Sequence, residues 1–211
     1  EPQAFLVSLM RRDIREDGSA VMFEQNRLWR THPEMRYEGT VHEQFWPESL
    51  VMAGEGKSLL KTDIVIQHDG FANGMSREKV ERNLRLLKKE LDLRPGRMFY
   101  EVCLADTLAE AGDPEANVVH EEMVQRILRA NQQPEELVVA IVIGRALASV
   151  PDDQLHSPRT GKLLKFAHLW LGEFPGILWA AAGVERQKGN LRVALETLRQ
   201  LDALGRSGRF N

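Results

Sequence analysis

Two side chains in the first third of the chain, Glu43 and His68, have the chemistry of catalytic groups. Glu43 ends the segment Gly-Thr-Val-His-Glu at 39–43, and a carboxylate takes a proton from a hydroxyl group that it faces. If this segment is extended, side chains alternate, so only one of His42 and Glu43 faces such a site. His68 ends an apolar run, and its imidazole suits a divalent metal ion. The ordinary alternatives are a solvated carboxylate and a buried histidine bonded to backbone.

Arg27, Trp29 and Arg30 form a second group with binding chemistry. Guanidinium groups match phosphate oxygens bidentately, so both arginines could bind a phosphate. The indole of Trp29 offers a flat face to a sugar ring. The alternatives are a solvated strand face for the arginines and a place in the core for the tryptophan.

Three better-known motifs are absent. The run Ala-Gly-Glu-Gly-Lys-Ser at 53–58 imitates a phosphate-binding loop, but that motif requires a glycine where this chain has Val51. A zinc site needs clustered ligands, yet no paired cysteines occur and the histidines are scattered at His32, His42, His68, His120, His156 and His168. A serine hydrolase elbow, Gly-x-Ser-x-Gly, does not occur. Structural zinc and nucleophilic catalysis are therefore not expected.

The composition is that of a folded protein without a nucleic-acid footprint. Of 211 residues, 43% are hydrophobic, which is enough for a packed core. The 28 basic and 31 acidic residues leave a formal charge of −3 without long runs of one sign, so binding to DNA or RNA is not expected. The single cysteine, Cys103, allows no intrachain disulfide, and no signal peptide is predicted. A cytoplasmic location follows by default.

Strands are predicted to position these side chains. Apolar residues are dense over 4–10 and resume over 20–23 after the turn signal Glu-Asp-Gly-Ser at 16–19, which predicts a β-hairpin. A further strand is predicted over 59–68, where Ile64, Ile66 and His68 share one face. We therefore expect His68 at the end of a buried row.

Helices are predicted for the rest of the chain. Ser76 is a good N-cap, and Val80, Leu84 and Leu87 follow it at helical spacing. Further helices are predicted near 97–112, 115–131, 134–149, 159–172, 175–188 and 190–204, separated by turns with proline or glycine. The most apolar segment, 137–150, is too short to span a bilayer and carries Arg145, so no membrane span is expected.

Two of the predicted turns resemble the turn between the helices of a tetratricopeptide repeat. At Gly189, Ala181 and Ala182 come before the turn and Ala194 follows it, as close packing of two helices requires. At Gly112 the match is displaced by one position. The separation of the two glycines is not a multiple of the repeat of about 34 residues, so any array is irregular. A generic α-helical bundle is the alternative.

Three ordered segments resemble a family 2 glycosyltransferase. The first is Asn-Arg-Leu-Trp-Arg at 26–30, which is similar to the family's Arg-Leu-Phe-Arg segment, and the second is Gly-Thr-Val-His-Glu-Gln at 39–44. The third is Ile-Gln-His-Asp-Gly-Phe at 66–71, which leads into Lys-x-x-Arg-Asn-Leu at 79–84. The order and approximate spacing are those of the family, and the resemblance covers roughly residues 4–112.

This resemblance implies an inverting transfer of a sugar from a nucleotide sugar to an acceptor hydroxyl. It implies that Glu43 is the base that takes the acceptor proton and that His68 is a ligand of Mg²⁺ or Mn²⁺ beside the leaving diphosphate. Arg27, Trp29 and Arg30 are the implied substrate-binding residues.

The chain also departs from the family. In the third segment, Asp69 departs from the family pattern, and Phe71 stands where the family usually has Tyr. The acidic Asp-x-Asp motif of the family's donor-binding half does not occur. We therefore expect the chain to be the back half of an enzyme, to transfer no sugar alone, and to hold no tightly bound cofactor.

The predicted architecture is α+β. Residues 1–74 are expected to form the acceptor-side part of a glycosyltransferase domain, and residues 75–211 an α-helical, tetratricopeptide-like module. The expected partners are a nucleotide sugar and an acceptor in the parent enzyme, with a protein or peptide as a further partner on the helical module. The alternative function is a non-catalytic protein-interaction module.

Overall fold

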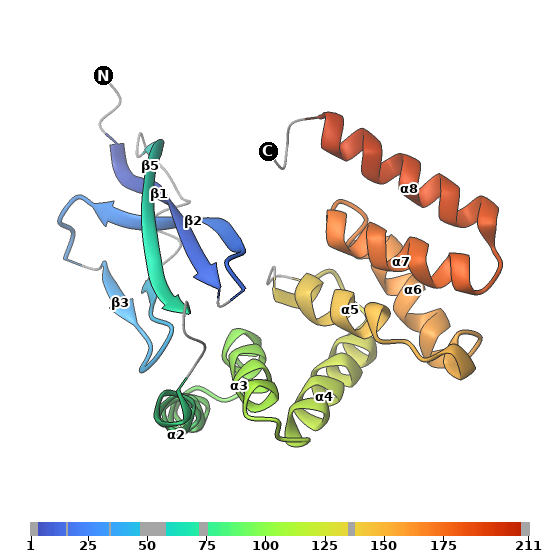
Figure 1. Ribbon diagram of the computed structural model, residues 1–211, viewed down its shortest axis with the longest axis horizontal. Coiled ribbons are helices and arrows are strands. Elements are labelled where there is room, and N and C mark those ends of the chain that lie inside the picture. The colour runs from blue at the N-terminus through green and yellow to red at the C-terminus, as the bar shows by residue number, and fades with distance from the viewer. Residues whose placement is uncertain are drawn as a thin grey trace. The chain divides into compact units, whose positions relative to one another are not determined.

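The chain has two compact units, Glu1–Pro95 and Gly96–Asn211. The computed structural model describes residues 4–15, 17–33, 35–46, 58–71, 76–134 and 138–207. The first unit contains all the strands of this described part, and the second consists of helices joined by turns (Figure 1). The predicted α+β class is confirmed.

The predicted β-hairpin at the start of the chain is present. Strands β1 (Ala4–Arg15) and β2 (Ala20–Trp29) pair antiparallel, with Ile14 opposite Ala20 next to the turn. Gly18 in the turn has φ 79°, a conformation that glycine adopts without steric cost.

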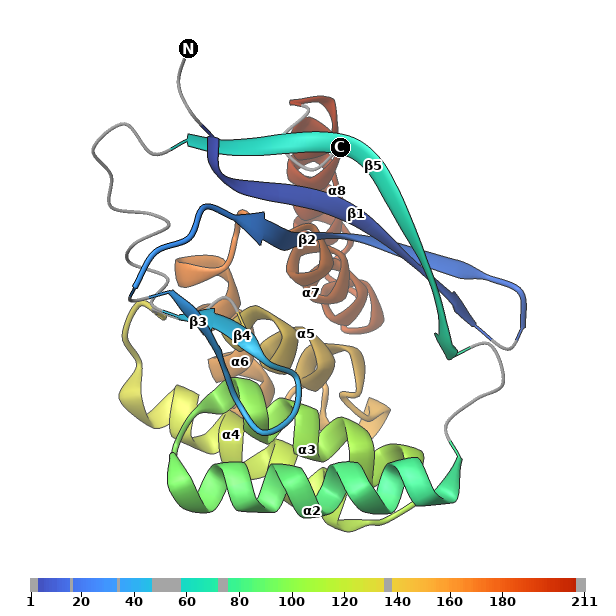
Figure 2. The ribbon, with the colours of Figure 1, turned by 90° about the vertical axis from the view of Figure 1, so that its left-hand side faces the viewer.

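Strand β5 (Ser58–Phe71) pairs parallel with β1, which gives the sheet order β2-β1-β5 (Figure 2). The predicted strand is confirmed, but the expected buried row is wrong. Ile64 is 58% exposed, Val65 50% and Ile66 42%. Successive side chains of a strand point to opposite faces. Other described residues therefore cover neither face of β5 at this position.

A short hairpin and one helix complete the first unit. Strands β3 (Arg36–Glu38) and β4 (Gln44–Trp46) pair antiparallel and enclose the loop 39–43. Helix α2 (Arg77–Leu93) begins at Ser76, whose hydroxyl accepts the backbone N–H of Lys79 at 3.3 Å, so the predicted N-cap is present.

Helix α2 belongs to the strand-rich unit, which extends to Pro95. The sequence had suggested a boundary after residue 74, a position outside the described residues. The physical reason for the later division is that α2 bonds to the β3–β4 loop: the hydroxyl of Thr40 donates to the carbonyl of Leu86 at 3.0 Å. Residues Val80 and Leu87 of α2 are buried.

The second unit has six α-helices in its described residues, near the predicted positions. They are α3 (Met98–Glu110), α4 (Glu115–Ala130), α5 (Val138–Ala148), α6 (Pro158–Trp170), α7 (Pro175–Gln187) and α8 (Leu191–Arg206), with a short 3₁₀ helix at Asp152–Gln154. Gly112 and Gly189, with φ of 71° and 82°, end α3 and α7 and allow the turns into α4 and α8. None of the helices in the described ranges is both long and apolar enough to span a membrane.

The core of the second unit is built around α5, which packs against α3, α4, α6 and α7. Val142 and Ile143 of α5 are fully buried, as are Leu163 and Ala167 of α6. Helices α7 and α8 contact each other, and Ala181, Ala182 and Ala194 are buried.

Candidate functional site

A cluster of charged and aromatic side chains lies on the three-stranded sheet. Arg11 and Asp13 are two residues apart on β1 and therefore share a face. Asp13 is opposite His68 of β5, and Arg11 is opposite Phe23 of β2. The Arg11 guanidinium lies 4.8 Å from the centre of the Phe23 ring, within the range of a cation–π contact.

Asp13 is the central acceptor of this cluster. It is only 7% exposed, and a buried carboxylate needs donors around it. Arg11 supplies two of them, from Nε to Oδ1 at 2.5 Å and from Nη2 to Oδ2 at 2.6 Å. This forked geometry is the strongest arrangement of an arginine with a carboxylate.

The same carboxylate orients His68. The Nδ1 atom of His68 lies 3.1 Å from Asp13 Oδ1 and 3.3 Å from Arg11 Nη2. Because the guanidinium is directed at the carboxylate, we assign the proton of the neutral ring to Nδ1, which donates to Asp13. In this tautomer Nε2 carries the lone pair, and a carboxylate behind the opposite ring nitrogen is typical of metal-binding histidines.

Glu43 lies in the loop 39–43 between β3 and β4, and its side chain is exposed. The segment is not extended at His42, and extension was the condition for His42 and Glu43 to point to opposite sides. His42 has φ 52°, a left-handed conformation that is uncommon outside glycine, so strand alternation does not apply. Glu43 has no side-chain hydrogen bond or ion pair with another described residue.

Helix α2 anchors this loop at Thr40. The backbone N–H of Thr40 donates to Glu90 Oε2 at 2.9 Å, and its hydroxyl donates to the carbonyl of Leu86 at 3.0 Å. Glu90 also pairs with Arg94. Two turns of α2 thus fix a residue three positions before Glu43.

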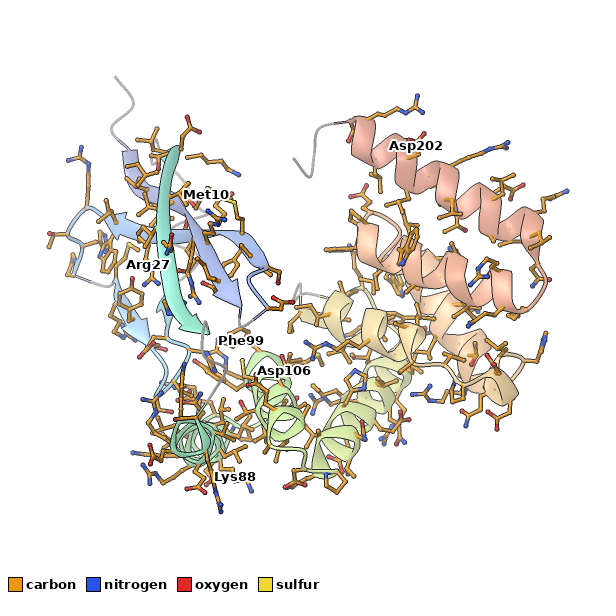
Figure 3. All side chains as sticks on the ribbon, viewed as in Figure 1. Met10, Arg27, Lys88, Phe99, Asp106 and Asp202 are labelled. Carbon is orange, nitrogen blue, oxygen red and sulfur yellow. The ribbon has the colours of Figure 1, made fainter. Side chains whose placement is uncertain are left out.

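The predicted substrate-binding residues lie on and just after β2. Arg27 (Figure 3) and Arg30 are exposed, and Trp29 is half-buried. The Trp29 ring contacts Tyr37 of β3 edge to face, with 5.2 Å between ring centres and 85° between ring planes. An exposed arginine pair is consistent with a phosphate ligand and equally with a solvated strand face.

The contacts bring some of the predicted site residues together and leave others apart. Trp29 is tied to β3, and β3 leads into the loop that carries Glu43. His68 belongs to the Asp13 cluster instead. Within the described ranges, no hydrogen bond or ion pair links Glu43 to His68 or to Arg27.

A complete metal site is not formed by this chain in the residues that the structure describes, where no three His, Cys, Asp or Glu side chains cluster. His68 fits as a single ligand because Asp13 lies behind its ring.

Asp13, Thr40 and Glu90 were not predicted as functional residues. Asp13 lies within the long strand β1. Asp is depleted in strands, so its position in the predicted hairpin could have drawn attention to it. Thr40 and Glu90 gave no comparable signal, because a carboxylate on a helix is most often solvated.

The helical unit has a groove of its own. It has a volume of about 380 Å³ and is lined by α3, α4 and α5, including Ala109, Ala116 and His120. Beside it, Arg145 of α5 donates to both carboxylate oxygens of Asp106 of α3. Burial lowers the pKa of His120, so its ring is neutral at pH 7.

Comparison with known protein families found no family model that matches this sequence. Comparison with curated proteins found no significant match.

Proposed function

We propose that this chain is the acceptor-side part of an inverting glycosyltransferase domain, similar to family 2, followed by a helical module. The parent enzyme transfers a sugar from a nucleotide sugar to an acceptor hydroxyl. The donor-binding part of that enzyme is not contributed by this chain.

The observation that supports this proposal best is that contacts link the surroundings of the first two segments of the resemblance to each other and to helix α2. Trp29 of the first segment packs on Tyr37, just before the second segment. Thr40 of the second segment bonds to Glu90 of α2, the helix that holds the end of the third. These contacts lie within one compact unit, Glu1–Pro95.

The open sheet is a second support. Parallel strands normally have both faces covered, and β5 pairs parallel with β1. Yet Ile64, Val65 and Ile66 of β5 are all largely exposed, as is Leu60. Such a strand fits a larger α/β domain in which further layers cover the sheet.

In the proposed reaction Glu43 accepts the proton of the acceptor hydroxyl while the hydroxyl oxygen attacks the anomeric carbon. The bond from that carbon to the nucleotide diphosphate breaks on the opposite side, which inverts the configuration. Arg27 and Arg30 pair with phosphate oxygens, and the Trp29 ring stacks on a sugar.

His68 is the one residue of the chain that we assign to a divalent metal ion. His68 would hold a Mg²⁺ or Mn²⁺ ion there, and the ion would supply positive charge to neutralise the leaving diphosphate. Asp13 accepts from Nδ1 of His68, so Nε2 carries the lone pair that would bind the metal ion.

The first test is Glu43→Gln in the complete parent enzyme. The amide keeps the shape and hydrogen bonding of the side chain but cannot accept the proton, so turnover should fall by roughly 10²- to 10⁴-fold with donor binding nearly unchanged. Glu81→Gln, an exposed position on α2, is the matched control and should keep normal turnover. Normal turnover in Glu43→Gln would remove Glu43 from the mechanism.

The second test separates the metal from the base. His68→Ala should weaken the apparent affinity for Mn²⁺, and raising the Mn²⁺ concentration should recover part of the rate. Added metal should not rescue Glu43→Gln. A loss in His68→Ala that metal cannot rescue, together with a lower melting temperature, would assign His68 to a structural role.

A protein-interaction module is the second candidate function, and the groove along α3, α4 and α5 favours it. Stacked helical hairpins present such surfaces to peptides and proteins. If the complete parent protein transfers no sugar from any nucleotide sugar in the presence of Mn²⁺, this binding function replaces the enzymatic one.

A further inference from the structure

Glu90 is a carboxylate with no exposed surface, placed near the end of α2. Burying a charged group without partners is costly, and the reaction proposed above does not use it. Its presence therefore needs an explanation from its contacts.

Those contacts connect the helix to the β3–β4 hairpin. Oε2 accepts the N–H of Thr40 at 2.9 Å, and Oε1 accepts from the Arg94 guanidinium. Arg94 Nη2 also lies 3.8 Å from Glu38 Oε2, at the end of β3. Glu90 and Arg94 together link strand β3 and the loop 39–43 to α2.

The loop requires such an anchor. Strands β3 and β4 have three residues each, and an isolated two-stranded hairpin is marginally stable. Gly39 and His42 both have positive φ, at 118° and 52°, and a non-glycine residue in this region persists only when its surroundings hold it.

Glu90 is ionised and acts as an acceptor only. Burial raises its pKa, but the hydrogen bonds from the Thr40 N–H and from Arg94 outweigh that effect, and the pKa is lowered below its ordinary value. Both carboxylate oxygens are therefore available to accept bonds at neutral pH.

We propose that Glu90 is a positioning residue that fixes the loop 39–43, so that Glu43 is presented to substrate in one orientation. The anchoring of the loop stands on the contacts of Glu90 alone. Its consequence for catalysis rests on the proposed function.

Glu90→Gln is the sharpest variant. An amide has one oxygen, so it accepts from Thr40 or from Arg94 but not from both, and its NH₂ group then faces a donor. Glu90→Ala removes both bonds. Glu81→Gln, an exposed carboxylate on the same helix, is the matched control.

Amide hydrogen exchange measured by NMR on the whole chain tests the anchor. The Thr40 amide should exchange about tenfold faster or more in Glu90→Gln, because a hydrogen bond to a charged acceptor is lost or weakened. The Arg94 amide, which donates to the Glu90 carbonyl at 2.9 Å, should stay protected and report that α2 is intact. The control variant should change neither amide.

Two results would overturn the anchor. One is unchanged exchange at Thr40 in both Glu90 variants. The other is an equal acceleration of every amide in the first unit, which would make Glu90 a general stabiliser of the fold.

Activity of the parent enzyme separates this inference from the proposed function. If both hold, Glu90→Gln lowers kcat by about tenfold or more at unchanged donor KM, because only interactions realised in the transition state are lost. Fast exchange at Thr40 with normal kcat would support the anchor and overturn its consequence for catalysis, and Glu43→Gln would then decide the role of Glu43. Slow exchange at Thr40 with reduced kcat would overturn the anchor and leave Glu43 in place.

Discussion

The carboxylate of Asp13 and the imidazole of His68 face each other across the parallel strands β1 and β5, with 3.1 Å between Oδ1 and Nδ1. Arg11 completes the pair from the same face of β1. This contact ties the two parallel strands together with side chains as well as with backbone bonds.

Asp13→Asn should shift the tautomer of His68 and destabilise the first unit. The amide cannot accept from Arg11 and His68 as a carboxylate does, and we expect a loss of about 1–3 kcal/mol. Nitrogen-15 NMR of the His68 ring reports the tautomer, and chemical denaturation reports the stability. Asp63→Asn, an exposed position on β5, is the control. An unchanged His68 spectrum in Asp13→Asn would contradict our assignment of the proton to Nδ1.

Ile143 and Ile141 form a matched pair on α5, the first fully buried and the second 48% exposed. Ile143→Ala leaves a cavity in the centre of the helical unit and should cost about 2–5 kcal/mol of unfolding free energy. Ile141→Ala should change it by less than about 0.5 kcal/mol. Urea denaturation followed by circular dichroism measures both. Equal losses would show that α5 is not the centre of the core.

Cys103 should be a slow nucleophile in the folded chain. Burial, with a smaller contribution from Asp106, raises the pKa of its thiol to about 12, and only the thiolate reacts. Iodoacetamide at pH 8 should therefore modify it much more slowly before unfolding in urea than after. Fast modification of the folded chain would contradict this environment.

The same shift predicts a dependence of stability on alkaline pH. The folded pKa lies above the ordinary value of 9.0, so the unfolded chain loses this proton first. The contribution of the protonated Cys103 thiol to the free energy of unfolding is fully present below about pH 9. It is lost as the pH rises toward about 12. Cys103→Ser should weaken this alkaline loss in a denaturation series.

The segment Gly96–Asn211 should fold without the first unit. Its hairpins are local in sequence, and its core residues come from its own helices. Heating the isolated segment should give a cooperative loss of helical circular dichroism. A largely unfolded signal would show that the helices depend on the strand-rich unit.

Much of the secondary structure could be predicted because its causes are local. The N-cap at Ser76, the turn at Gly18 and the helix ends at Gly112 and Gly189 each depend on a few neighbouring residues. Apolar spacing likewise located the helices of the second unit. The division between the two units could not be predicted from neighbouring residues, because it depends on the hydrogen bond from the Thr40 hydroxyl to the carbonyl of Leu86.

The candidate site could be predicted only in part. The sequence by itself pointed to Glu43 and His68, because both lie in segments that resemble a family 2 glycosyltransferase and both have side chains suited to the implied chemistry. The partners that orient them were decided by the tertiary structure. Asp13 reaches His68 only through the parallel pairing of β1 with β5, and Glu90 reaches Thr40 across 50 residues of chain. Such pairings depend on how the whole unit packs, and no short stretch of sequence contains that information.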